Sequence, residues 1–131
     1  MKFESLTLEQ KKRINDTTRE VLKDLGAPSH IDGYNYTIAA VLLMVADPNS
    51  KLPMTTDVGV YPVLAEGFHS KPSRVERGIR YLKDLILLKG NLKAIYTIFG
   101  NSAKAKTGLM TNRNFLSGIK IEVLNRLGRL I

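Results

Sequence analysis

A short stretch in the second half of the sequence carries side chains that can recognise DNA bases. It reads Ser-Arg-Val-Glu-Arg-Gly-Ile-Arg, from Ser73 to Arg80. An arginine can donate two hydrogen bonds to the O6 and N7 atoms of guanine, and a glutamate can accept one from N4 of cytosine. The spacing of Arg74, Glu76 and Arg77 therefore suits the reading of G and C on neighbouring base pairs.

The charge of the chain is concentrated in the same half of the sequence. The 131 residues carry a formal net charge of +8. Residues 1–68 sum to −2, whereas residues 69–131 sum to +10. This asymmetry predicts a positive surface made mainly by the second half, and a basic excess favours a polyanionic partner. Nucleic acid would be bound through its phosphates in a salt-dependent way.

Helical periodicity recurs throughout the sequence and predicts an all-α fold. No alternating run rich in Val, Thr and Tyr indicates a strand. We expect about six helices, at residues 8–25, 33–46, 58–68, 72–88, 92–99 and 112–127, with a basic loop at 101–110. No linker rich in Pro, Gly or Ser divides the chain, so residues 1–131 are predicted to form a single compact bundle, one domain.

Local signals predict where several of these helices begin and end. Thr7 and Gln10 have the spacing of a capping box at the start of the first helix. Ser70 is expected to cap the fourth helix, and Gly90 to end it. Thr111 is expected to cap the last helix.

Two consecutive helices, 58–68 and 72–88, are joined by a turn of three to four residues, as in a helix-turn-helix. The second helix is amphipathic, and its apolar face is expected to hold Val75, Ile79, Leu82 and Ile86. The opposite face is expected to hold Ser73, Glu76, Arg77, Arg80 and Lys83. A recognition helix presents base-reading side chains in its first turns, which reach into the major groove. The same pattern is also typical of an ordinary solvated helix, in which Glu76 and Arg80 would form a stabilising i,i+4 pair.

Motifs between about residues 14 and 127 occur in the order found in one known family. They are His30 to Tyr36, Val60-Tyr61-Pro62, Ser73 to Arg80, Gly90-Asn91, Ile98-Phe99-Gly100, and Thr111-Asn112 with Phe115. Together they resemble the C-terminal effector domain of the sporulation initiation response regulator, stage zero sporulation protein A. The stretch from Ser73 to Arg80 is the most specific part of this resemblance.

The resemblance implies a six-helix bundle whose fourth helix reads a short G/C-containing box in double-stranded DNA. The positions that match its base-reading residues are Arg74, Glu76 and Arg77. The candidates for contact with the DNA backbone are His69, Lys71, Ser73 and Arg80. The resemblance also implies head-to-tail self-association on tandem boxes, helped by the last helix, and contact with RNA polymerase near residues 89–101.

The sequence differs from the family pattern at several positions. Gly78 stands where alanine is usual, which costs about 1 kcal/mol in helix propensity. The stretch from Asn112 to Asn114 lacks the family's acidic residue, so the interface made by the last helix is expected to differ. Residues 1–30 show no βα pattern of a receiver domain, so phosphorylation control of the usual kind is not expected.

No residue pattern predicts an enzyme, a metal site or a cofactor. The chain has no Cys and therefore no disulfide, thiolate zinc site or Cys nucleophile. His30 and His69 lie far apart in the sequence, without a carboxylate at metal-ligand spacing. Residues 100–107 nearly match a phosphate-binding P-loop, but Ala105 replaces the second required glycine and no strand precedes the run.

Membrane association is not expected either. The longest apolar run, Ile38 to Ala46, is far shorter than the roughly 20 residues of a spanning helix. The N-terminus lacks the apolar stretch of a signal peptide, so a cytoplasmic location is predicted.

Three hypotheses follow from these patterns. The first is a non-enzymatic, sequence-specific transcriptional regulator that binds double-stranded DNA through a helix-turn-helix at about residues 58–88. The second is a protein–protein adaptor or antagonist that keeps the effector fold but has lost operator binding. The third is a DNA-binding accessory protein of a mobile element.

Overall fold

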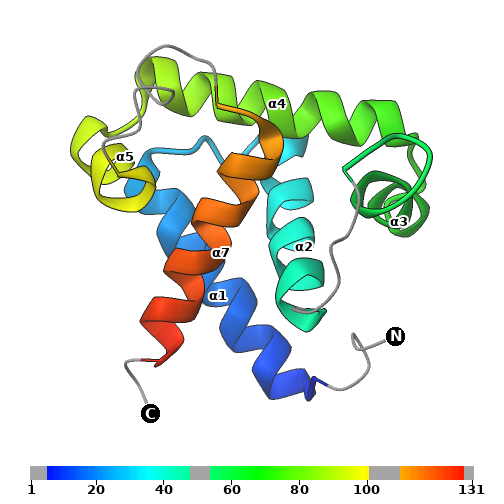
Figure 1. The fold of residues 1–131 in the computed structure, drawn as a ribbon, viewed down its shortest axis with the longest axis horizontal. Helices are drawn as coiled ribbons and strands as arrows, with labels where there is room; N and C mark the ends of the chain where they lie inside the picture. The colour runs from blue at the N-terminus through cyan, green and yellow to red at the C-terminus, as the bar shows by residue number, and fades with distance from the viewer. Residues whose placement is uncertain (1–5, 48–53, 101–109, 129–131) are drawn as a thin grey trace.

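The computed structural model describes residues 6–47, 54–100 and 110–128 (Figure 1). These ranges hold six α-helices and no strand, in agreement with the all-α expectation. The helices are α1 (Leu8–Leu25), α2 (Asp32–Ala46), α3 (Val60–Gly67), α4 (Pro72–Lys89), α5 (Leu92–Phe99) and α7 (Asn112–Gly128). Among them, none is long and apolar enough to cross a membrane.

Helix α4 lies across the ends of α2 and α7, with α3 near its N-terminal end and α5 near its C-terminal end (Figure 1). Helix α4 packs chiefly on α2 and α3, whereas α7 packs mainly on α1 and α2. One long face of α4 is therefore left uncovered on the outside of the bundle.

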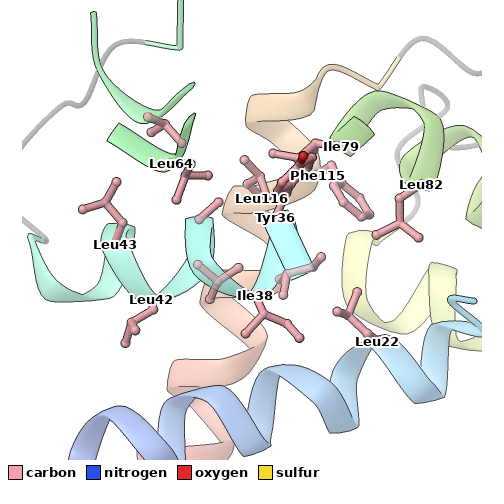
Figure 2. Close-up of a cluster of buried hydrophobic side chains, with 14 of the residues drawn as sticks. Leu22, Tyr36, Ile38, Leu42, Leu43, Leu64, Ile79, Leu82, Phe115 and Leu116 are labelled. Atoms are coloured by element: carbon pink, nitrogen blue, oxygen red, sulfur yellow. The ribbon is translucent and has the colours of Figure 1, made fainter. Parts of the chain in front are cut away.

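A shared apolar core joins these helices (Figure 2). The predicted inner face of α4 is confirmed, because Val75, Ile79, Leu82 and Ile86 are at most 1% exposed. They belong to one buried cluster with side chains from the other helices, among them Leu22, Ile38, Leu43, Leu64, Phe115 and Leu116. Each fully buried side chain of this size contributes about 1.5–3 kcal/mol to folding, and the burial fixes which face of α4 points outward.

The predicted caps of the first and last helices are confirmed. The Gln10 backbone N–H donates to Thr7 Oγ1 at 3.0 Å, and the Thr7 N–H donates to Gln10 Oε1 at 2.9 Å. The Asn114 N–H donates to Thr111 Oγ1 at 3.1 Å. Each cap satisfies backbone donors that the first turn of a helix leaves unpaired.

The prediction that Ser70 caps α4 is wrong. The N-cap is Lys71, whose side chain makes no capping hydrogen bond. Pro72 begins the helix and forces the preceding residue into an extended conformation, so Lys71 has φ −111° and ψ 144°. The Ser70 hydroxyl lies instead 3.5 Å from the hydroxyl of Tyr36 on α2.

Three glycine positions bring helices into close contact. A Cβ atom on Gly33 would lie 2.1 Å from the carbonyl oxygen of Gly78, so α2 and α4 cross backbone to backbone. A Cβ atom on Gly78 would lie 2.9 Å from the Tyr36 ring, which gives a packing reason for glycine at this position. Gly90 ends α4 as expected, with extended backbone (φ −75°), and a Cβ there would lie 2.5 Å from the Leu25 carbonyl oxygen.

Candidate nucleic-acid interface

Helices α3 and α4 are joined by a tight turn at residues 68–71. The Ser70 N–H donates to the Ala65 carbonyl at 2.8 Å, and the His69 N–H donates to the Glu66 carbonyl at 3.3 Å. This is the Schellman arrangement, which requires a left-handed residue after the helix cap and usually places glycine there. His69 takes that place with φ 52°, at a backbone cost of about 1 kcal/mol.

The turn is supported from α2 by one aromatic side chain. The ring of Tyr36 meets that of Phe68 edge to face, with centroids 5.0 Å apart and an interplanar angle of 80°. The Tyr36 hydroxyl also donates to Ser70 Oγ at 3.5 Å, a long contact. Because Tyr36 is itself buried, it fixes the turn, and with it the start of α4, relative to the core.

The structure brings together all seven residues predicted to contact DNA, on the turn and the first three turns of α4. Six of them are exposed: His69, Lys71, Ser73, Arg74, Arg77 and Arg80. The Arg77 Nε donates to the Ser73 carbonyl at 3.3 Å, which keeps that side chain along the helix surface. A helix start with exposed arginines and backbone donors is suited to bind phosphates and base edges.

Glu76, the seventh of these residues, differs from the others because its side chain is only 25% exposed. The expected pair with Arg80 is present, with Arg80 Nη1 3.6 Å from Glu76 Oε2. The same oxygen accepts a hydrogen bond from Asn112 Nδ2 at 3.3 Å. Asn112 is the first residue of α7, 36 residues away in sequence.

Asn112 also binds two further oxygens with the same amide nitrogen. Its Nδ2 lies 3.0 Å from the hydroxyl of Tyr61 on α3 and 3.2 Å from the backbone carbonyl of Glu76. The sequence does not assign this role to Asn112 or Tyr61, although both lie in motifs that carry the family resemblance. The start of α7 is thus joined to α3 and α4 at one point beside the exposed face.

Burial raises the pKa of Tyr61 above its ordinary value, because an apolar environment disfavours the phenolate. The hydrogen bond with Asn112 opposes this change, and the negative charge of Glu76 adds to it. Tyr61 is therefore a neutral hydroxyl beside Glu76 at physiological pH.

The prediction that Lys83 lies on the solvated face of α4 is wrong. Lys83 is 6% exposed, and its Nζ donates to the Met110 carbonyl at 2.7 Å. Met110, two residues before α7, meets α4 on this side, which helical periodicity alone cannot indicate. Lys83 therefore fixes the approach to α7 and is no part of the exposed basic surface.

Two other features considered in the sequence, the P-loop-like run and possible metal ligands, can be compared with the structure. The P-loop-like run, apart from Gly100, and the predicted basic loop at 101–110, apart from Met110, lie outside the described residues. Within the described ranges, no three side chains of His, Asp or Glu gather in a way that could hold a metal ion.

An all-α bundle in which a short helix, a tight turn and a basic helix follow one another has the arrangement of a helix-turn-helix, a class of fold found in DNA-binding proteins. Comparison with known families agrees with this class. Residues 18–123 match the family described as Sporulation initiation factor Spo0A C terminal. The match runs from within α1 to within α7 and covers most of the chain, so the protein belongs to this family of DNA-binding effector domains from a sporulation regulator.

Proposed function

We propose that the chain is a sequence-specific, double-stranded DNA-binding protein that regulates transcription. Helix α4 would enter the major groove, with Arg74 and Arg77 donating to guanines and Glu76 accepting from cytosine. The observation that carries this proposal is the exposure of both arginines in the first two turns of a helix that begins after a supported tight turn.

Four further residues would hold the DNA backbone. His69 and Lys71 lie on the turn, and Ser73 and Arg80 lie on the exposed face of α4. Pro72 has no N–H and the Arg74 N–H donates to the Lys71 carbonyl at 2.9 Å, so the backbone donor of the first turn that would meet a phosphate is the Ser73 N–H. Such contacts set the register of the protein on the duplex and supply salt-dependent affinity.

The proposal extends to how the chain acts and to its partners other than DNA. Residues 1–131 act as one domain in the cytoplasm, by binding and without a catalytic step. Partners other than DNA would be a second copy, arranged head to tail on tandem boxes, and RNA polymerase.

A binding titration tests base reading. A duplex enriched from a random pool, and its single-base-pair variants, are titrated by fluorescence anisotropy with the parent, Arg77→Ala and Glu76→Ala. Loss of one bidentate contact is expected to cost about 1–3 kcal/mol and to relax specificity at one base pair. Arg19→Ala is the control, because it removes an exposed arginine that belongs to α1 and is not one of the seven candidate residues.

Two results would contradict the proposal. If both variants bind every duplex as the parent does, α4 does not read bases. If the parent binds no duplex in a salt-dependent way but binds a partner protein, the adaptor hypothesis is favoured.

A further inference from the structure

Glu76 is the one acidic residue among the seven candidate DNA-contact residues. The first residue of α7, Asn112, holds its carboxylate. Asn112 is 8% exposed, and its Nδ2 contacts oxygens of both α3 and α4. Of the three oxygens, the backbone carbonyl and the carboxylate oxygen of Glu76 can only accept, so the amide must turn its nitrogen toward them. The orientation of this side chain is therefore defined by its surroundings.

We infer that Asn112 is a positioning residue that sets base specificity by holding the Glu76 carboxylate. The inference rests on the proposed reading of a base by Glu76. Asn112 itself need not touch DNA, since it acts from the side of α4 that faces α7.

The contact with Asn112 restrains Glu76 more firmly than the contact with Arg80 does. Arg80 is half exposed and approaches Glu76 at 3.6 Å, and ion pairs of this kind contribute little. Asn112 is buried and is itself held by the Tyr61 hydroxyl at 3.0 Å. Near it, the bond from Lys83 to Met110 fixes the chain that leads into α7.

Both contacts fall on one carboxylate oxygen, Oε2 of Glu76. The carboxylate is thereby oriented before DNA arrives, and its other oxygen would accept from the base. A free glutamate would have to be ordered on binding, and ordering one flexible side chain weakens an interaction by roughly 2- to 10-fold. Without this restraint, the affinities for duplexes with the correct and an incorrect base pair would differ by less.

The test measures specificity at each position. Parent, Asn112→Ala, Glu76→Ala and the double variant are titrated against the duplex enriched from a random pool and all its single-base-pair variants. We expect Asn112→Ala to reduce discrimination by roughly 2- to 10-fold at the base pair that Glu76→Ala relaxes, and nowhere else. In the Glu76→Ala background, Asn112→Ala is expected to have no further effect on specificity.

A second variant changes the charge at the same position, and urea denaturation of both Asn112 variants checks that they are folded. Asn112→Asp keeps the shape of the side chain, and an acidic residue is favourable in the first turn of a helix. It places a like charge beside Glu76, so we expect it to reduce discrimination at the same base pair. Asn114→Ala is the matched control, because Asn114 is exposed two residues further along α7.

The outcomes separate the inference from the proposed function. If Glu76→Ala relaxes one base pair and neither Asn112 variant affects it, the inference is overturned and the proposed reading stands. If the Asn112 variants weaken binding to all duplexes equally, the residue is merely structural and the inference is overturned. If Glu76→Ala relaxes no base pair, the proposed role of Glu76 fails, and the inference fails with it.

Discussion

The two sides of the candidate DNA-binding surface are built in different ways. On the side of the turn, Arg74 and Arg77 are exposed on α4, and the Arg77 Nε donates to the Ser73 carbonyl of the same helix. On the side facing α7, Glu76 is held by Asn112, 36 residues away. The positions of Arg74 and Arg77 thus depend on where α4 begins, whereas the position of the Glu76 carboxylate also depends on where α7 begins.

Tyr36→Ala is expected to have the largest effect, because it removes the support of the turn. The side chain is 6% exposed and contacts both Phe68 and Ser70. Truncation of a buried aromatic residue costs about 3–5 kcal/mol in unfolding free energy. Urea denaturation measures the loss, and a cost below about 1 kcal/mol would show that the turn does not depend on α2.

Lys83→Ala tests the side that faces α7. It leaves the Met110 carbonyl without its donor, at an expected cost of about 1–3 kcal/mol in unfolding free energy. Lys89→Ala removes an exposed lysine from the same helix and should change stability by no more than about 0.5 kcal/mol. Equal effects in chemical denaturation would contradict the burial of Lys83.

Tyr61→Phe removes the hydroxyl that anchors Asn112, and should cost about 0.5–1.5 kcal/mol in unfolding free energy at neutral pH. The pKa of Tyr61 is raised in the folded state, so its neutral form stabilises the fold below its ordinary pKa of about 10. That contribution is lost as the pH rises through the folded pKa. In urea denaturation at strongly alkaline pH, the parent should therefore lose more unfolding free energy than Tyr61→Phe does. Parallel pH dependences of the two proteins would contradict the raised pKa of Tyr61.

His69→Gly should have the smallest effect and the opposite sign. Glycine relieves the left-handed strain at φ 52° but loses more backbone entropy on folding, so a net gain of about 0.5–1 kcal/mol is expected. DNA affinity should fall to a similar degree for every duplex, since a backbone contact carries no sequence information. A drop in stability would show that the His69 side chain holds the turn.

Features encoded locally were predicted well from the sequence. The boundaries of the fourth helix were predicted as 72–88 and are Pro72–Lys89, because its apolar spacing and flanking Pro and Gly are local signals. The third helix begins two residues later than predicted, at Val60, since Gly59 has φ 98° and cannot be helical.

Contacts between distant segments could not be predicted in this way. Periodicity placed Lys83 on the polar face of α4, whereas the side chain is buried and donates to the Met110 carbonyl, 27 residues away. The bond from Asn112 to Glu76 likewise depends on the packing of α7 beside α4, which no spacing in the sequence encodes. Residue type, spacing and the family resemblance were therefore enough to propose the candidate residues, whereas the contact that holds Glu76 in place could not be predicted.

Selection of bound DNA from a random duplex pool tests the central claim most directly. The parent is expected to enrich a motif containing G and C, and the double variant Arg74→Ala with Arg77→Ala to enrich one that has lost the guanines those side chains bind. Enrichment of the same motif by both proteins would contradict base reading by α4.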